Sequence, residues 1–319
     1  MNYKGANKTK YFGAFIMTYE RSEILKCTIQ NLKNQSFPPE YILIIDNSET
    51  ENTENLIKKL EDPNLGYYRV GYNSGPAGAA KFGLEKLVSQ GFEWIYWGDD
   101  DNPPKNNTFF EHLFSKMERH SNELEYPIGV IGGRGGNLNK ITGRIRSLNN
   151  KQLKKASLVG VDYVPGGHTM IVNSQVVKNK ILPDEKLFFG FEELDFCLRV
   201  QNNGFSIVID TEEWIKDHVE AGNLSPEYRW RGSSFGNPET LWRSYYSTRN
   251  LFLLYRDNKF FMAFTFLFFK TVLKSIAGFR HGLSYGKQNF RVQWQAIIDF
   301  LLGDFGKSKN LEFILHKRG

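Results

Sequence analysis

The stretch Trp94–Pro104, WIYWGDDDNPP, decides the fold of this chain. Trp94–Trp97 is a short apolar run typical of a buried strand, and three adjacent aspartates, Asp99–Asp101, follow it. Adjacent carboxylates repel one another unless a cation or solvent compensates their charge, and hard divalent cations prefer oxygen ligands. Alternate members of the run, Asp99 and Asp101, can turn toward one ligand. The run therefore indicates a metal site at a strand end, and the other interpretation is an exposed acidic turn before two prolines.

Three further apolar runs precede this strand, and each of them ends in polar residues. An amphipathic helix is predicted at Ala77–Gln90, between the third run and Trp94. Strands that alternate with helices predict an α/β fold with a Rossmann-like, mostly parallel sheet flanked by helices. Ligands bind beyond the carboxyl ends of such strands, so the polar ends are expected to meet at one rim. The runs are Tyr11–Thr18, Tyr41–Ile45 and Tyr67–Tyr72, and their polar ends are Thr18-Tyr19, Asp46-Asn47 and Asn73-Ser74-Gly75.

The remainder of the chain is predicted to mix strands with loops and then to become helical. Residues 1–225 are expected to form the α/β domain, and residues 226–319 a helical region. A loop or hairpin is predicted at Asn137–Lys155, a helix at Glu192–Asn203 and a long helical region from Thr240 onward. The predicted strands are Pro127–Gly133, Val161–Val164, His168–Val172, Ser206–Asp210 and the strand-like segment Thr211–Ile215.

Composition limits the classes of function. The 319 residues, 40% of them hydrophobic, are ample for a large core, and the net charge of +6 suits anionic partners. Cys27 and Cys197 belong to no C-x-x-C pair, which indicates neither a disulfide framework nor a zinc site and favours the cytoplasm. The polar N-terminus predicts no signal peptide. Nucleic-acid binding is the weakest interpretation, because the basic residues are scattered and no recognised module is present.

A second acidic cluster lies in Phe189–Asp195, FGFEELD. Glu192, Glu193 and Asp195 stand at a helix start, where the helix dipole favours carboxylates, and acidic first turns are ordinary. The neighbouring apolar side chains indicate partial burial, which raises a carboxylate pKa and suits a general base. His218 is a weaker candidate: most lone histidines are structural, although an imidazole is a good third ligand for manganese-like ions.

The segment Asn73–Ala80, NSGPAGAA, is rich in small residues at a strand-to-helix junction. Small residues let a backbone approach a diphosphate, and a helix N-terminus favours anions. The spacing matches neither a P-loop nor a dinucleotide fingerprint, so a phosphate cradle and a simple tight turn are equally supported. Lys81 could add a positive charge there.

Taken together and in this order, the motifs of residues 10–220 resemble the family 2 glycosyltransferases with the GT-A fold, and within them the galactofuranosyl- and rhamnosyltransferase-like branch. MTYER looks like the donor-binding turn, which implies roles for Thr18, Tyr19 and Arg21. IIDNSET resembles the nucleobase-binding segment (Asp46), and NSGPAGAAKFGLEKL the Asn-Gly segment near the donor (Asn73, Gly75 and Lys81). WGDDDNPP looks like the metal-binding motif, with Asp100 placed on the donor side, and FFGFEELDFCLRV the motif of the catalytic base.

The resemblance implies a mechanism. Asp99 and Asp101, helped by His218, would hold Mn²⁺ or Mg²⁺ against the diphosphate of a UDP- or dTDP-sugar. Glu193, which matches the base by position, would deprotonate a hydroxyl of a glycan or lipid-linked acceptor, and a single displacement would invert the configuration. Many family members have Glu-Asp where this chain has two glutamates, so Glu192 and Asp195 remain substitutes.

Two other classes of protein deserve comparison. A sugar nucleotidyltransferase would carry a Gly-rich, basic loop after the first strand, and MTYERSE is not one. A non-catalytic sugar- or nucleotide-binding relative would not need the acidic residues to be intact.

The apolar stretch Leu251–Phe269 predicts either amphipathic helices on an anionic membrane surface or a core or dimer-forming helix pair. Trp230 and Gly166–His168 are expected on the acceptor side. Basic residues cluster near the apolar stretch, namely Arg243, Arg249, Arg256, Lys270, Lys274, Arg280 and Lys287.

Overall fold

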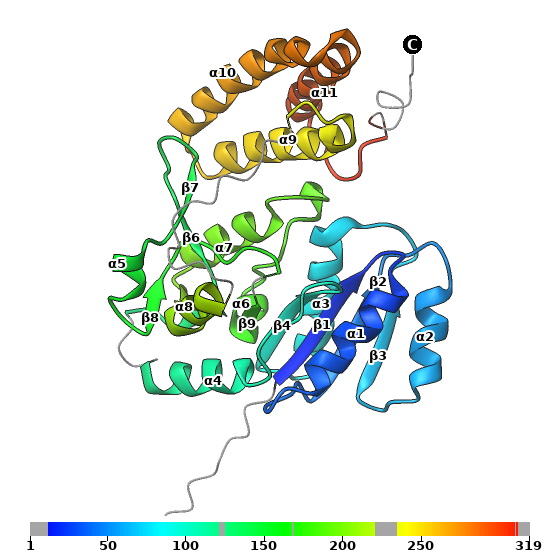
Figure 1. The fold of residues 1–319 in the computed structure, drawn as a ribbon, viewed down its shortest axis with the longest axis vertical. Coiled ribbons are helices and arrows are strands. Elements are labelled where there is room, and N and C mark those ends of the chain that lie inside the picture. Colours follow the sequence, from blue (N-terminus) through cyan, green and yellow to red (C-terminus); the bar gives the residue numbers. More distant parts are fainter. Residues whose placement is uncertain (1–11, 121–124, 168, 221–234, 310, 312–319) are drawn as a thin grey trace, which may run out of the picture.

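The computed structural model describes residues 12–120, 125–167, 169–220, 235–309 and 311. An α/β layer carries the sheet, and three long helices lie against one end of it (Figure 1). The large sheet has eight strands in the order β3-β2-β1-β4-β9-β5-β10-β8, and β6 and β7 form a separate hairpin. The strands are β1 (Phe12–Thr18), β2 (Tyr41–Asp46), β3 (Leu65–Arg69), β4 (Trp94–Asp99), β5 (Ile128–Gly132), β6 (Gly136–Leu138), β7 (Ile145–Ser147), β8 (Leu158–Gly160), β9 (Met170–Asn173) and β10 (Ser206–Asp210).

The first half of the sheet is parallel, as the alternating pattern predicts. Strand β1 pairs in parallel with both β2 and β4, and β2 pairs with β3. Every residue of β1 is buried because helices cover both faces of the sheet. Phe15 and Met17 pack toward α3 (Gly75–Ser89). Phe12, Ala14 and Ile16 pack toward α1 (Ser22–Lys33), α2 (Asn52–Leu60) and α4 (Phe109–His120).

The second half departs from simple parallel order. Strand β9 lies antiparallel between β4 and β5, and its first residue, Met170, pairs with Trp97 near the end of β4. The chain that enters β9 therefore arrives at the same rim at which β4 ends. Strand β10 is parallel to β5 and carries the antiparallel edge strand β8. The predicted fold class, a mostly parallel sheet flanked by helices, is confirmed.

Two predicted strands are wrong. The segment Val161–Val164 forms only an isolated bridge through Tyr163, and the strand of this region is β8, three residues earlier. Asp162 explains the difference, because its carboxylate accepts a 2.6 Å hydrogen bond from the backbone of Leu138 and holds the chain to the hairpin instead.

The strand-like segment Thr211–Ile215 belongs to helix α8 (Thr211–Glu220). The Asp210 carboxylate accepts hydrogen bonds from the amides of Glu212 and Glu213, at 2.9 and 3.2 Å. This local capping overrides the strand propensity of the segment, and the sequence D-T-E-E carries the signal for it.

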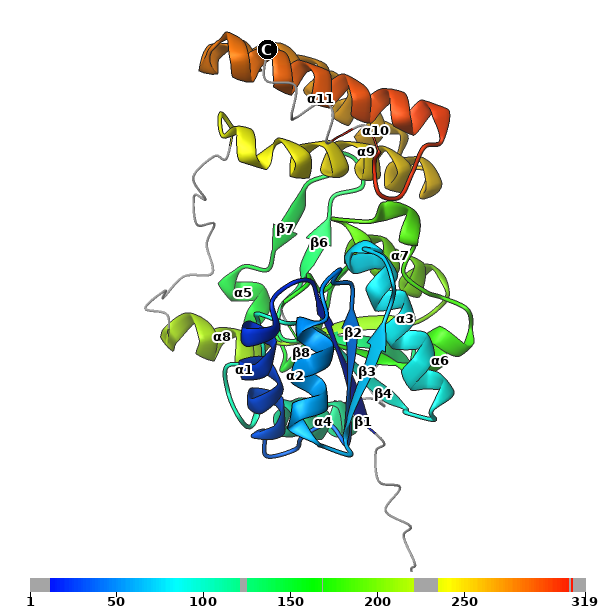
Figure 2. The same cartoon turned by 90° about the vertical axis from the view of Figure 1, so that its right-hand side faces the viewer.

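The C-terminal region is helical, as predicted. It comprises α9 (Leu241–Asp257), α10 (Phe261–Ala277) and α11 (Leu283–Leu302). Helix α9 packs on α7 (Glu192–Asn202) through Leu254 and Tyr255, and on the start of α3 through Phe252. Figure 2 shows α9 between the α/β layer and the other two helices. The predicted domain boundary at residue 225 lies outside the described residues and stays a prediction.

Candidate active site

Asp99, the last residue of β4, stands at the rim predicted from the strand ends. The register places Asp99 opposite Met17 and places Asp46 opposite Thr18, so three strand ends lie side by side. Asp99 as a whole residue is half-buried. Burial is the main cause that raises its pKa to about 7, and the charges of Glu193, Asp101 and Asp100 add to the rise. A cation at this position would relieve that repulsion.

The other two aspartates are tied to the turn that follows β1. Asp100 is fully buried and accepts a 2.7 Å hydrogen bond from the Thr18 hydroxyl. Arg21 pairs with Asp100 at 2.5 Å and with the exposed Asp101 at 2.6 Å. The backbone oxygen of Asp100 accepts a further bond from the Thr28 hydroxyl. Asp100 therefore fastens β4 to the β1–α1 turn, while Asp101 remains accessible to a ligand.

Glu193 lies across from Asp99, and Gly166 lies between them. A Cβ on Gly166 would stand 2.1 Å from Oε1 of Glu193 and 3.8 Å from Oδ2 of Asp99. Both carboxylates thus converge on the segment that enters β9. Burial raises the pKa of Glu193, and hydrogen bonds from the backbone amides of Glu193 and Gly166 oppose that rise. A carboxylate with a raised pKa, oriented by backbone amides, is suited to accept a proton.

This geometry predicts that Gly166→Ala lowers turnover without unfolding the protein. The backbone of Gly166 tolerates a side chain, and the new methyl group would displace only the flexible end of Glu193. We expect kcat to fall about 100-fold, the typical result of misplacing a reacting group by about 1 Å, with little change in melting temperature. Gly160→Ala on β8, where a Cβ meets only one atom at 4.0 Å, is the matched control. Full activity of Gly166→Ala would show that the Glu193 position is unimportant.

The two alternative bases occupy different surroundings. Glu192 is buried, and its Oε2 has no hydrogen-bond partner in the part of the chain that the structure describes. Burial, followed by the charge of Glu193, holds the pKa of Glu192 well above its usual range. Asp195 pairs with Arg199 one helical turn later on α7. Among the three, Glu193 is the carboxylate that contacts the Gly166 segment beside Asp99.

The loop before α7 is strained, and α9 holds it. Phe188 and Phe191 both have positive φ, at 58° and 71°, conformations that cost free energy in non-glycine residues. The Asn250 amide donates hydrogen bonds to the carbonyl oxygens of Leu187, Phe189 and Gly190, at 2.8, 2.9 and 3.0 Å. The C-terminal helices therefore set the backbone that presents Glu193.

Arg249 supports the same loop and corrects an expectation. The sequence places it among surface basic residues, but it is fully buried, with its guanidinium 3.4 Å from the carbonyl oxygens of Lys186 and Leu187. Its ring neighbours are Tyr245 and Tyr246. The roles of Arg249 and Asn250 were missed by sequence reasoning. The signal that could have found them is the pair Arg249-Asn250, a charged and an amide residue side by side within a helix rich in aromatic residues and leucine.

The donor-side residues predicted from the sequence are distributed along the rim. Asn73 accepts a bond from the amide of Gly75, which has a positive φ of 70°. A Cβ on Gly75 would lie 2.2 Å from the carbonyl oxygen of Phe188, so the glycine permits a close approach of the α7 loop to α3. Tyr19 is exposed, and Lys81 pairs with Glu185 at 3.4 Å. Phosphate binding by this segment stays a prediction.

A cavity of about 410 Å³ adjoins these residues. Its lining comes from the loops after β2 and β3, the segment before α7 and the C-terminal region, namely Glu49, Gly71, Tyr72, Asn73, Ser74, Glu185, Phe188 and Lys307. Asp46 is fully buried at the end of β2, where it accepts hydrogen bonds from the amide of Ser48 at 2.9 Å and from the Tyr67 hydroxyl at 2.8 Å. A nucleobase contact to Asp46 would have to share or replace one of them.

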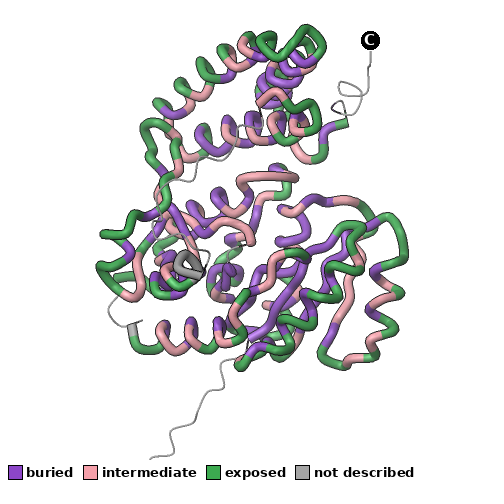
Figure 3. Tube along the Cα trace, in the orientation of Figure 1, coloured by how far each residue is buried: buried purple, intermediate pink, exposed green. Residues whose placement is uncertain are grey.

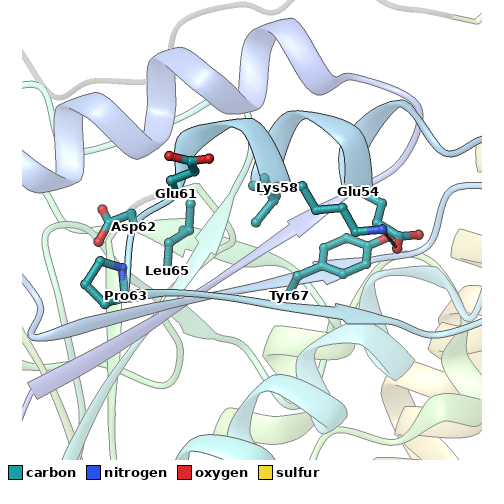
Figure 4. Close-up of a pocket in the computed structure, with 8 residues that line it drawn as sticks. Glu54, Lys58, Glu61, Asp62, Pro63, Leu65 and Tyr67 are labelled. Atoms are coloured by element: carbon teal, nitrogen blue, oxygen red, sulfur yellow. Dashed lines mark ion pairs between the residues drawn. The ribbon is translucent and has the colours of Figure 1, made fainter.

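A second cavity, of about 470 Å³, lies at the β3 edge of the sheet between β3 and α2 (Figure 4). Its lining includes the ion pair of Glu54 with Lys58, together with Asp62 and Tyr67. It contains none of the carboxylates of the β4 and α7 motifs. The rim at Asp99 and Glu193 therefore stays the candidate site.

The donor set at the rim suits a hard divalent cation. No three histidine, cysteine, aspartate or glutamate side chains converge as a metal site among the described residues. Asp99 and Asp101 nevertheless fit a cation that takes its remaining ligands from phosphate oxygens and water, as Mg²⁺ commonly does. His218 lies in α8, but its side chain falls outside the described residues, as do Trp230 and His168. The predicted roles of these three residues stay predictions.

Comparison with known proteins decides the family. Residues 14–179, just over half of the chain, match the sequence profile of Glycosyl transferase family 2. The chain belongs to this family. The enzyme class predicted from the motifs, an inverting family 2 glycosyltransferase, is thereby confirmed. The match contains most of β1, all of β2 to β4 and the aspartate run.

Two curated relatives are similar over most of the chain. Galactofuranosyltransferase GlfT1 of Mycolicibacterium smegmatis is 22% identical over 214 residues, which cover 61% of this chain and 67% of the relative. The dTDP-rhamnosyl transferase RfbF of Shigella flexneri is 24% identical over 252 residues, which cover 77% of this chain and 80% of the relative. Both belong to the branch that the sequence resembles.

Solved structures of S. aureus TarS share the fold. Its complex with UDP-GlcNAc aligns with a TM-score of 0.50 at 14% identity, over 95% of this chain and 75% of that chain. In a longer TarS structure, with a TM-score of 0.48 and 16% identity, the alignment covers 96% of this chain, which spans only 46% of that one. At these identities the likeness concerns the fold alone.

Proposed function

We propose that this family 2 enzyme transfers a hexose from a nucleoside-diphosphate sugar to a hydroxyl group of a glycan or lipid-linked acceptor, with help from Mn²⁺ or Mg²⁺. The observation that carries the proposal is the approach of Asp99 and Glu193 to one glycine, Gly166, at the carboxyl ends of the strands. The Asp99 carboxylate is suited to bind the cation, and the Glu193 carboxylate is suited to accept the proton.

The glutamate and the aspartates of the site have separate roles in the proposed reaction. Glu193 accepts the proton of the attacking hydroxyl, and the amide of Gly166 orients its carboxylate. Asp99 and Asp101 would hold the cation, and a bound cation would neutralise the departing nucleoside diphosphate. Arg21 keeps Asp101 at the rim through its 2.6 Å ion pair. The hydroxyl attacks the face opposite the leaving group, so one displacement inverts the anomeric configuration.

For the donor we propose a UDP- or dTDP-sugar, and for the sugar galactofuranose, rhamnose or a similar hexose. One relative's name is that of a galactofuranosyltransferase and another's that of a dTDP-rhamnosyl transferase, and a TarS structure was solved with UDP-GlcNAc. Such transfers build cell-surface polysaccharides. We also propose a cytoplasmic location, because both cysteines, Cys27 and Cys197, are free thiols.

Nucleotide binding tests the donor site. We expect UDP or dTDP to raise the melting temperature of the purified protein in the presence of Mn²⁺, and to do so much less after addition of EDTA. A ligand at 100 times its Kd adds about 2.7 kcal/mol to the free energy of unfolding. Asp101→Ala should abolish the Mn²⁺-dependent part of this gain. Without ligand, the melting temperature of this variant should change little, because the lost ion pair between Arg21 and Asp101 is exposed. ADP is the ligand control.

The outcomes separate the alternatives. No response to UDP or dTDP, with or without Mn²⁺, would contradict the proposed donor. Metal-dependent binding without turnover of any sugar donor would indicate a non-catalytic relative. A Mn²⁺-dependent gain that survives Asp101→Ala would remove Asp101 from the metal site.

A further inference from the structure

Helix α10 exposes a continuous apolar stripe on the side that faces away from the bundle. Its residues lie 4, 3, 4 and 3 positions apart, the spacing that places side chains on one side of a helix. They are between 52% and 68% exposed, and the opposite side packs through Ala263, Thr271 and Ser275. Figure 3 shows the contrast between α10 and the largely buried α9. The stripe consists of Met262, Phe266, Phe269, Leu273 and Ile276.

The charged residues of α10 and of most of α11 have one sign. From Asn258 to Ile298 the sequence contains no aspartate or glutamate. The same span carries Lys259, Lys270, Lys274, Arg280, Lys287 and Arg291, all of them exposed except the half-buried Lys274. An apolar helix face surrounded by cations complements a surface that has an apolar interior and anionic groups at its boundary.

Hydrogen bonds hold α10 against α11 and α9. The Asn289 amide of α11 donates to the carbonyl oxygens of Lys274 and Ser275, at 2.8 and 3.2 Å, and the Lys274 ammonium group donates to the Ser244 hydroxyl of α9 at 2.5 Å. By length and composition alone, Phe261–His281 could cross a bilayer. Its packed inner side instead suits a helix that lies in the plane of a membrane interface.

We propose that the apolar stripe of α10 docks on an anionic lipid bilayer, with the stripe inserted at the headgroup boundary and the surrounding lysines and arginines on lipid phosphates. A second copy of this chain is a poorer occupant, because a twofold interface would bring the same cations face to face without acidic partners in this span. The proposal concerns lipid binding and stands apart from the sugar transfer.

Docking would place the loop before α7, and with it Glu193, at a defined height above the membrane. Helix α9 packs against α10 on one side and binds the loop before α7 through Asn250 on the other. Figures 1 and 2 show the same order of layers, with α10 and α11 on the side of α9 that faces away from the sheet. An acceptor anchored in lipid would therefore meet Glu193 at a distance set by this bundle.

Flotation of the full chain with lipid vesicles tests the proposal. We expect the protein to float with vesicles of equal parts phosphatidylglycerol and phosphatidylcholine at least tenfold more than with phosphatidylcholine alone. Raising NaCl from about 0.1 M to about 0.5 M should reduce the bound fraction, because it shortens the Debye length. The variant Met262→Gln, Phe269→Gln, Leu273→Gln should lose at least tenfold in binding. The control Ile24→Gln, Tyr126→Gln changes exposed apolar residues elsewhere and should bind normally.

Three results would overturn the proposal. The first is a wild-type chain that does not bind anionic vesicles. This result does not depend on any variant folding correctly. The second is a triple variant that keeps its melting temperature and still floats. The third is a wild-type dimer in sedimentation equilibrium that the triple variant dissociates, which would assign the stripe to a second copy. Nucleotide binding by the same samples reports separately on the donor site.

Discussion

Glu193→Gln is expected to lower kcat by about 10²–10⁴-fold while leaving nucleotide binding nearly unchanged. The amide keeps the size of the carboxylate and one oxygen that accepts a backbone hydrogen bond, but it cannot take a proton from the acceptor hydroxyl. Glu193 lies beside Gly166, opposite Asp99, and its removal should therefore act on the chemical step. Steady-state kinetics with a sugar donor, together with UDP or dTDP binding in Mn²⁺, separate the two effects.

Glu192→Gln and Asp195→Asn are the matched controls for this experiment. The nearest atoms to a Cβ on Gly166 belong to Glu193 and Asp99, not to Glu192 or Asp195, and Asp195 is paired with Arg199. Glu193 is therefore the residue expected to receive the proton. Glu192→Gln should keep most of the activity and stabilise the fold by removing a buried acid whose pKa is raised. If Glu193→Gln has near-normal turnover and one of the controls loses most of its activity, the base is the residue changed in that control, Glu192 or Asp195.

Asp99→Asn is expected to affect stability and function in opposite directions. Folding raises the pKa of Asp99 from 3.8 to about 7. Between pH 3.8 and about pH 7, the folded state therefore binds a proton that the unfolded state has released. Stability consequently falls as pH rises through this window, and the full cost is present above about pH 7. At 1.36 kcal/mol for each pKa unit, the metal-free variant should gain up to about 4 kcal/mol at pH 8.

Urea unfolding of the metal-free protein at about pH 8 and about pH 5 measures this effect. The advantage of Asp99→Asn should shrink at the lower pH, because the wild-type carboxyl group is then protonated in the folded state. Asp257→Asn, an exposed aspartate on α9 that pairs with Arg256, is the control and should be neutral at both values. Asp99→Asn should also lose Mn²⁺-dependent nucleotide binding. An equal gain at both pH values would contradict the assigned pKa.

Much of the rim could be predicted because its signals are local. Runs such as Tyr41–Asp46 and Trp94–Asp99 combine apolar strand residues with an abrupt polar end, and parallel pairing then brings the ends together. Errors arose where a different local or tertiary interaction prevailed. The segment after Asp210, for example, became helical through capping. The antiparallel direction of β9 lies beyond what the sequence predicts, because no periodicity in a four-residue strand records it.

The sequence by itself determined the alternation of strands and helices up to β4, the family and the acidic motifs, because these depend on hydrophobic periodicity and on residue types at fixed spacing. Only the tertiary structure decided which of these acids contacts the Gly166 segment beside Asp99. Two adjacent glutamates on a helix differ by about 100° in direction, and the packing of α7 turns Glu193 toward Gly166 and buries Glu192. It likewise decided that Arg249 is buried at the loop before α7 while the apolar stripe of α10 is exposed. The sequence alone leaves both open, because burial depends on contacts between segments far apart in the chain.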